Sequence, residues 1–215
     1  MNLPHLFCLT SDRINISHSQ QVLEFCKAGV RFIQIRCKEL SIKDFLREAH
    51  MSVEICQRFE ARLIINDSVE VANKVEADGV HLGLNDMHIS MARDLLGETK
   101  LIGYTIHSYQ EITQNIIENA NYIGMGPFRE SKTKTDLSSV LSENDYQLMI
   151  QRFDPTPVYI IGGIDIDDIS LSEKLGNHGI AVCSCLSKGR NLDIRKIQKI
   201  VSEFQNNNLM KALNC

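Results

Sequence analysis

The sequence predicts an eight-stranded parallel α/β barrel in which each strand is followed by a helix. Eight short, mostly apolar runs recur along the chain, and amphipathic stretches lie between them. Strands that alternate with helices indicate βα units and a parallel sheet. The 215 residues provide about 27 residues for each of eight units, which is compact but within the range of this barrel. An open, doubly wound sheet is the alternative architecture.

The eight runs are apolar along most of their length, as expected for parallel strands that are buried on both faces. They are residues 5–10, 31–36, 62–66, 79–82, 101–105, 121–125, 157–161 and 179–183. In a βα barrel the active site lies where the strands end. The residues that follow each run are therefore the candidates for function.

The stretches between the runs place their apolar residues on one helical face. Val22, Phe25 and Cys26 share such a face in the first stretch. The last helix is predicted to begin at Asn191, a residue type that suits a helix N-cap. These patterns support the alternation of strands with helices.

The composition is that of an ordinary globular protein and excludes several classes. With 23 basic and 27 acidic residues the net charge is −4, whereas proteins that bind nucleic acids or membrane surfaces usually carry a basic surplus. No run approaches the roughly 20 apolar residues of a membrane span, and no secretory signal is evident. We expect small-molecule substrates, neither nucleic acid nor a membrane as partner, and a single barrel domain over residues 1–215.

The seven cysteines are odd in number and form no repeated C-x-x-C pattern. Most lie in apolar runs, where cysteine behaves as a small hydrophobic residue. They predict reduced thiols in a cytoplasmic protein. A zinc site is not expected, because no close pair of ligands is matched by a second pair.

Three polar residues at the end of the second run point to the same side of an extended chain: Gln34, Arg36 and Lys38. An amide, a planar guanidinium and an ammonium group in one place suit a phosphate or a diphosphate. The alternative is a solvated strand end with ordinary surface charges.

Carboxylates follow the third and fourth runs. Asn66 and Asp67 end the third run, and Asp86 comes shortly after the fourth. Two carboxylates at the ends of neighbouring strands can share one Mg²⁺, a hard cation that is often held jointly by carboxylates and substrate phosphates. Alternatively, each aspartate caps the helix that follows it.

The fifth run ends at Thr105, and His107 follows it. His107 could act as an acid or a base, or it could be a hydrogen-bonded core histidine. Ser108 is predicted to cap the next segment, with Glu111 completing a capping box.

One long connection covers residues 126–143 and alternates hydroxyl groups with lysines. It contains Ser131, Thr133 and Lys134, which could close over an anion. A solvated basic loop is the alternative.

Gly163 and Ser184 lie in the loops after the last two runs. In βα barrels these loops often form a phosphate site, although paired glycines also occur in simple turns. Two anion sites and a dicarboxylate site on one face suggest two phosphorylated substrates, one of them a diphosphate with Mg²⁺.

Seven motifs in this order carry a resemblance to a known family. They are QIRCK, LIIND, ADGVHLGLND, IGYTIHS, YIGMGPFRESKTK, PVYIIGGI and GIAVCS, from residue 34 to residue 184. Together they resemble thiamine phosphate synthase, also called thiamine-phosphate pyrophosphorylase. The resemblance implies a βα barrel and a Mg²⁺-dependent transferase. That enzyme would join a hydroxymethylpyrimidine diphosphate to a thiazole phosphate or its carboxylate, giving thiamine phosphate and pyrophosphate.

The resemblance also implies roles for individual residues. Arg36, Lys38 and Lys134 would act on the diphosphate, and Asp67 and Asp86 would hold Mg²⁺. The residues implied to bind substrate are Gln34, Asn66 and Thr105 near the pyrimidine diphosphate, and Ser131, Thr133, Gly163, Cys183 and Ser184 at the thiazole phosphate.

Three residues depart from the family pattern. Cys37 stands where an acidic residue is usual, Leu84 where glutamine is usual, and Ser131 where threonine is more usual. Two alternatives stay open: a thiazole tautomerase of the same superfamily, which shares His107, and a catalytically silent binding protein of thiamine metabolism.

Overall fold

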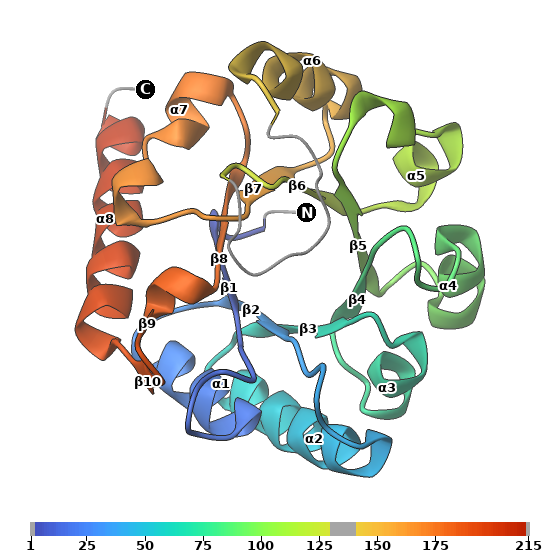
Figure 1. Ribbon diagram of the computed structural model, residues 1–215, viewed down its shortest axis with the longest axis vertical. Helices are drawn as coiled ribbons and strands as arrows, with labels where there is room; N and C mark the ends of the chain where they lie inside the picture. The colour runs from blue at the N-terminus through green and yellow to red at the C-terminus, as the bar shows by residue number, and fades with distance from the viewer. Residues whose placement is uncertain (1–2, 130–140, 214–215) are drawn as a thin grey trace.

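The computed structural model describes residues 3–129 and 141–213, except for the side chains of Glu173 and residues 207–213. Eight parallel strands pair in chain order, and β8 pairs with β1, so the sheet closes into a barrel (Figure 1). The strands are β1 Leu6–Leu9, β2 Phe32–Ile35, β3 Arg62–Asn66, β4 Gly79–Leu82, β5 Leu101–Ile106, β6 Tyr122–Met125, β7 Val158–Ile161 and β8 Gly179–Val182. The predicted barrel is confirmed, and its closure excludes the open sheet.

Helices surround the ring of strands (Figure 1). They are α1 His18–Lys27, α2 Ile42–Arg58, α3 Val69–Lys74, α4 Ile89–Leu96, α5 Gln114–Asn119, α6 Glu143–Phe153, α7 Leu171–Leu175 and α8 Ile194–Leu213. The described residues also form three 3-10 turns: η1 Tyr109–Glu111, η2 Ile166–Asp168 and η3 Ser184–Leu186. Serine side chains begin several helices; Ser17, for example, accepts the Gln20 N–H and forms a full capping box.

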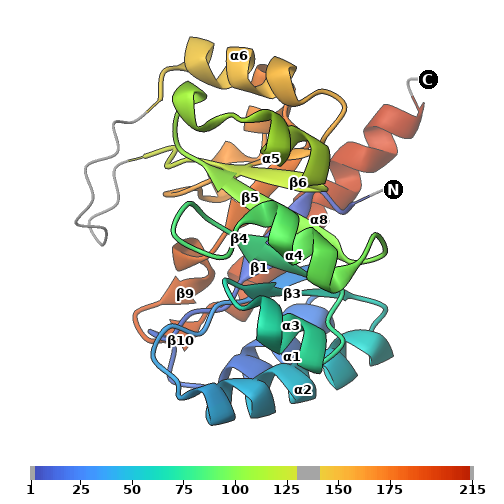
Figure 2. The ribbon, with the colours of Figure 1, turned by 90° about the vertical axis from the view of Figure 1, so that its right-hand side faces the viewer.

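The start of the last helix differs from the prediction. Asn191 does not cap it but lies in β10 Asn191–Leu192, which pairs with β9 Ser187–Lys188 in a short hairpin. The hairpin lies at the end of the barrel where the strands finish (Figure 2). Helix α8 begins two residues after β10, and Asp193 Oδ1 accepts the Lys196 N–H at 3.0 Å. Aspartate thus takes the capping role because the hairpin uses Asn191 in its ladder.

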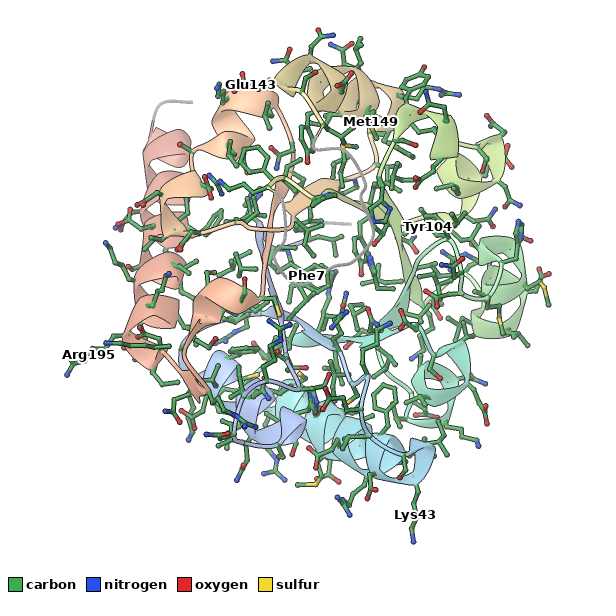
Figure 3. All side chains as sticks on the ribbon, viewed as in Figure 1. Phe7, Lys43, Tyr104, Glu143, Met149 and Arg195 are labelled. Carbon is green, nitrogen blue, oxygen red and sulfur yellow. The ribbon has the colours of Figure 1, made fainter. Side chains whose placement is uncertain are left out.

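The barrel interior is filled by side chains from alternate strand positions. This interior cluster consists of Leu3, Phe7, Leu9, Phe32, Ile64, Leu101, Tyr122, Tyr159 and Ala181. Phe7 lies at the centre of the ring of strands (Figure 3), and its ring stacks on Phe32 with centroids 4.1 Å apart. The residues between these positions face outward into a second cluster beneath the helices. The barrel is therefore solid, and substrates can meet it only at an end.

Gly103 makes room for one polar contact inside the barrel. A Cβ atom at this position would lie 2.1 Å from the Tyr122 ring and 2.5 Å from His81 Nδ1. No side chain fits there, so glycine is required for His81 and Tyr122 to meet.

Among the described residues, none of the helices has the length and apolar character needed to cross a membrane.

Candidate active site

Strand periodicity directs polar side chains to the mouth of the barrel. Phe32 and Ile64 belong to the interior cluster, so Gln34 and Asn66, two residues further along their strands, also face inward. Both are buried at the carboxyl ends of β2 and β3. Arg36 follows β2 immediately, and its N–H donates to Thr10 Oγ1 at 3.0 Å. The predicted anion-binding residues of the second strand therefore lie at the mouth.

Lys38 and Asp67 form an ion pair at this mouth, with Nζ 2.6 Å from Oδ2. Asp67 has a φ of 64°, in the left-handed region that few residues other than glycine, asparagine and aspartate adopt. Its N–H donates to the His81 carbonyl at 2.8 Å, which fixes the turn at the end of β3. The turn holds the carboxylate beside Lys38.

Asp86 lies next to this pair. Burial raises the pKa of the Asp86 carboxyl, and the Asp67 carboxylate, which is within hydrogen-bonding reach, raises it further. Asp86 Oδ2 also accepts the Gly83 N–H at 2.8 Å. Two crowded carboxylates offer the hard oxygen donors that Mg²⁺ prefers, and a divalent cation would relieve their repulsion. The donor set therefore fits Mg²⁺.

Neither aspartate caps a helix. Ser68 is the N-cap of α3 and accepts the Val71 N–H, while His88 stands at the N-cap position of α4. The capping alternative for Asp67 and Asp86 is wrong. Both carboxylates are free for another role because neighbouring residues occupy the cap positions.

A buried histidine supports Thr105 from below. His81 Nε2 lies 2.7 Å from Thr105 Oγ1, and His81 Nδ1 lies 3.1 Å from the Tyr122 hydroxyl. Burial lowers the pKa of His81 to about 4, so the ring is neutral near pH 7. A neutral imidazole carries one proton, so it donates through one nitrogen and accepts through the other. His81 is not among the predicted site residues, although a polar side chain at an inward position of an apolar strand was the available signal.

His107 faces its own loop. Its N–H donates to Glu111 Oε2 at 2.9 Å, and its Nδ1 lies 3.5 Å from the same oxygen. The predicted capping box is wrong. The Ser108 hydroxyl caps no backbone N–H but donates to Glu111 Oε1 at 3.3 Å, and Glu111 Oε2 accepts the backbone N–H of His107 rather than that of Ser108. His107 is thus held at the rim of the mouth by Glu111.

Arg129 ties the end of β6 to the turn after β7. Its guanidinium donates to both oxygens of Asp168 at 2.6 Å and to the Gly163 carbonyl at 2.6 Å. Gly163 has a φ of 71°, and a Cβ there would lie 2.8 Å from Arg129 Cβ. The predicted phosphate-site glycine is therefore a conformational requirement of this loop contact. Arg129 was missed because its partner Asp168 is 39 residues away.

Cys183 and Ser184 end the eighth strand. Cys183 lies beside Thr10, with Sγ 3.9 Å from the Thr10 carbonyl oxygen, and burial raises the pKa of its thiol. Ser184 opens the η3 turn. Both lie at the same end of the barrel as Gly163, as predicted.

A family model described as "Thiamine monophosphate synthase" matches residues 6–186. The chain belongs to the thiamine monophosphate synthase family.

The chain is also similar to curated thiamine-phosphate synthases and to a solved structure. A thiamine-phosphate synthase of Flavobacterium psychrophilum is 42% identical over 179 residues, covering 80% of this chain and 87% of the relative. One from Bacteroides thetaiotaomicron is 34% identical over 195 residues, covering 88% and 93%. A thiamine phosphate pyrophosphorylase of Pyrococcus furiosus superposes with a TM-score of 0.79 at 26% identity, covering 93% of this chain and 96% of that structure.

In this member of the thiamine monophosphate synthase family, three predicted site residues lie outside the described part of the chain. Ser131, Thr133 and Lys134 belong to residues 130–140, and their placement stays a prediction.

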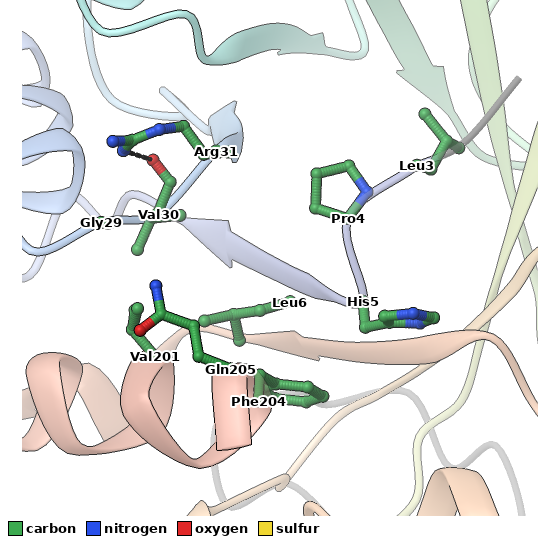
Figure 4. A pocket seen from close by; sticks show the side chains of 10 residues that line it. All are labelled: Leu3, Pro4, His5, Leu6, Gly29, Val30, Arg31, Val201, Phe204 and Gln205. Atoms are coloured by element: carbon green, nitrogen blue, oxygen red, sulfur yellow. Dashed lines mark hydrogen bonds between the residues drawn. The ribbon is translucent and has the colours of Figure 1, made fainter. Parts of the chain in front are cut away.

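A cavity of about 300 Å³ lies at the other end of the barrel of this family member (Figure 4). Its lining includes Pro4, His5 and Arg31 at the amino ends of β1 and β2, with Val201 and Phe204 of α8. The polar strand-end residues described above are absent from this lining. This cavity is therefore separate from the polar strand ends at the mouth.

Proposed function

We propose that the protein is a thiamine phosphate synthase, a transferase that joins hydroxymethylpyrimidine diphosphate to thiazole phosphate. Pyrophosphate leaves and thiamine phosphate forms. One observation carries the proposal: in a member of this family, Lys38, Asp67 and Asp86 meet at the barrel mouth beside Gln34 and Arg36. Cations and a paired carboxylate site at one place match a diphosphate that binds with a metal ion.

Arg36 and Lys38 bind the diphosphate of the pyrimidine substrate, and Gln34 and Asn66 hydrogen-bond it. Arg36 offers a planar fork of donors and Lys38 a point charge, which together neutralise oxygens of both phosphates. Asp67 and Asp86 would hold Mg²⁺, which supplies positive charge to the departing pyrophosphate. Lys38, now paired with Asp67, is the side chain that would turn from the carboxylate to the phosphate.

The reaction breaks the bond between the pyrimidine methylene carbon and the diphosphate oxygen. The bonding electrons leave with pyrophosphate, and the thiazole nitrogen forms the new bond to that carbon. The protein must therefore stabilise growing negative charge on the leaving group and hold the nitrogen in line. The filled barrel interior closes the site from below, which limits the water that could trap the carbocation.

Thr105, held by neutral His81, lies where the pyrimidine ring would bind. Gly163, Cys183 and Ser184 would bind the thiazole phosphate, together with Ser131 and Thr133. These assignments place the two substrates on neighbouring parts of one barrel face, as a direct transfer between them requires.

Lys134 is proposed to act on the leaving pyrophosphate. Charge that grows as the C–O bond breaks is stabilised mainly in the transition state, so Lys134→Ala should lower kcat by roughly 10²-fold, about 3 kcal/mol. Lys132→Ala is the matched control, and KM for the thiazole phosphate should change much less. Equal, small effects of the two substitutions would remove Lys134 from the proposal.

Purified protein incubated with both substrates and Mg²⁺ tests the function directly. Thiamine phosphate and pyrophosphate should appear in equal amounts, and chelation of Mg²⁺ should stop both. A thiazole tautomerase assay runs in parallel, with His107→Ala as the variant. Tautomerase turnover that depends on His107, without synthase turnover, would replace the proposal; tight binding of both substrates without turnover would indicate a binding protein.

A further inference from the structure

Three side chains with different ligand atoms converge behind the diphosphate cations. Asp12 lies in the loop after β1, His18 is the first residue of α1, and Cys37 follows β2. One carboxylate oxygen, one imidazole nitrogen and the Sγ atom all lie within 4.8 Å of one another. No motif in the sequence marks this cluster, because its members are separated by six and nineteen residues.

The cluster is distinct from the proposed Mg²⁺ site. Cys37 packs against the outer hydrophobic cluster beneath the helices, whereas Gln34 faces the barrel interior. Lys38 separates the two places: its backbone N–H donates to Asp12 Oδ2 at 3.1 Å, while its ammonium group pairs with Asp67. The cluster therefore lies on the far side of the diphosphate-binding strand end.

The histidine is already oriented for ligation. His18 is 4% exposed, its Nδ1 lies 2.7 Å from Thr10 Oγ1, and its Nε2 lies 3.0 Å from Asp12 Oδ1. Metal-binding histidines commonly have their second ring nitrogen fixed by a hydrogen bond of this kind. Thr10 is fully buried, so it can act as a rigid support.

We infer that Asp12, His18 and Cys37 bind one Zn²⁺ ion. Nitrogen, sulfur and carboxylate oxygen are the donors that Zn²⁺ takes, and three protein ligands with an open fourth position are typical of zinc sites that keep exchangeable water. Mg²⁺ prefers oxygen donors only and does not fit this set.

Binding balances in charge and protons. The Cys37 thiol releases its proton to solvent, and the neutral imidazole carries its proton on Nδ1, from which it donates to Thr10 Oγ1. One carboxylate, one thiolate and Zn²⁺ then sum to zero charge. No oxidant or other reactant is needed.

Zn²⁺ bound at this site would affect the position of the substrate-binding residues Arg36 and Lys38. Cys37 lies between Arg36 and Lys38. The backbone N–H of Arg36 donates to Thr10, which supports His18, and the backbone N–H of Lys38 donates to the ligand Asp12. Zn²⁺ would cross-link the loop after β1 to the end of β2 and fix the strand end that presents these two cations.

Titration with Co²⁺, a spectroscopic substitute for Zn²⁺, tests the inference on the full chain without Mg²⁺ or substrates. The wild-type protein should bind one equivalent with a thiolate-to-cobalt charge-transfer band, and Zn²⁺ should displace it. Zn²⁺ should also raise the melting temperature. Absence of the band and of the thermal shift would overturn the inference without any variant.

Matched variants identify the ligands. Cys37→Ser should abolish the band. Thr10→Val, which removes the hydrogen bond that supports His18, should weaken Co²⁺ binding roughly 10- to 100-fold. Asp12→Asn should weaken Co²⁺ binding at least as much as Thr10→Val. Cys185→Ser and Asp67→Asn are the controls, and both should keep the band. A band that survives Cys37→Ser, or that disappears in Asp67→Asn, would show that Co²⁺ binds elsewhere.

Discussion

At the scale of single residues, the site depends on groups whose charges are set by their neighbours. Asp67 and Asp86 crowd each other at the mouth, and Lys38 pairs with one of them. His81 stays neutral because it is buried between Thr105 and Tyr122. Each of these states can be changed by one substitution without disturbing the barrel.

Asp67→Asn should abolish synthase turnover while the protein stays folded. Asparagine keeps the left-handed backbone and the size of the side chain but removes the charge. Because Ser68 caps α3, no helix loses its cap. Steady-state kinetics and thermal unfolding of the same preparation check this. Unfolding of the variant, together with Mg²⁺-independent activity of the wild type, would contradict the assignment.

His81 should make the folded state less stable as the pH falls. Its folded pKa of about 4 lies below the ordinary value of 6.5, so the unfolded chain binds the proton more readily between these values. This contribution is fully present above about pH 6.5 and is lost as the pH falls toward 4, by up to about 3 kcal/mol. Urea denaturation at several pH values between 4 and 6.5 measures the free energy of unfolding. This free energy should depend less steeply on pH in His81→Asn than in the wild type. An NMR titration of the folded wild type in which His81 titrates near 6.5 would contradict the prediction.

At the scale of elements, one arginine organises the loops at the seventh strand. Arg129 follows β6, and Asp168 lies in the η2 turn between β7 and α7. Phe128 and Arg129 also donate backbone N–H groups to Gly162 O at 3.1 and 3.0 Å. Side-chain and backbone contacts together hold the Gly163 turn, which is proposed to bind the thiazole phosphate.

Arg129→Lys should raise KM for the thiazole phosphate several-fold. It should also lower the free energy of unfolding by about 1 kcal/mol, a small value because the Arg129 side chain is half-exposed and its ion pair is screened by water. Lysine keeps the charge but cannot bind both Asp168 oxygens and the Gly163 carbonyl together. The control is Lys174→Ala, which removes an exposed pair between α7 and α6 with Glu143. Equal effects of the two changes on KM would show that Arg129 does not position the turn.

At the scale of the whole molecule, the aromatic interior connects strands from all parts of the chain. Phe7, Phe32, Tyr122 and Tyr159 contact one another at centroid distances of 4.1 to 5.8 Å. They come from β1, β2, β6 and β7, so residues far apart in sequence share one packing unit. This arrangement supports our proposal that the chain is a single domain.

Phe32→Ala should destabilise the protein by about 3–5 kcal/mol, because it leaves a cavity that the closed barrel cannot fill. Leu95→Ala is the control: Leu95 is 58% exposed on α4, and its truncation should change stability by less than about 0.5 kcal/mol. Urea unfolding followed by circular dichroism and by tyrosine fluorescence measures both. Coincident transitions are expected for one domain, whereas separated transitions would contradict the single-domain proposal.

The fold could be predicted from the sequence because its signals are local. Each of the eight barrel strands lies within one residue of its predicted run, and Val22, Phe25 and Cys26 are buried as the helical spacing indicated. The wrong prediction at Asn191 has the same origin: a residue suited to a cap was taken for one, although a hairpin partner was present at Lys188.

The site could be predicted only where strand periodicity decides. Gln34 follows from alternation along its strand, whereas the roles of Asn66 and Thr105 are implied by the family resemblance. The same alternation marks the inward position of His81 on β4, but its contacts with Thr105 and Tyr122 come from strands 24 and 41 residues away. Arg129 could not be found in this way, because its partner Asp168 is 39 residues away. The same holds for Asp12, which meets Cys37, 25 residues further along the chain, only because β1 pairs with β2.

The backbone conformation of Asp67 bears on how this protein could become more thermostable. A left-handed aspartate raises the free energy of the folded state through its backbone. Glycine would relieve this backbone strain and also remove the repulsion between Asp67 and Asp86, at the cost of the exposed ion pair with Lys38. Variants selected for heat resistance alone, with no requirement for turnover, should therefore replace Asp67 early, so activity and thermostability oppose each other at this residue. Laboratory evolution of a hardier enzyme would have to hold position 67 fixed and seek its gains elsewhere in the barrel.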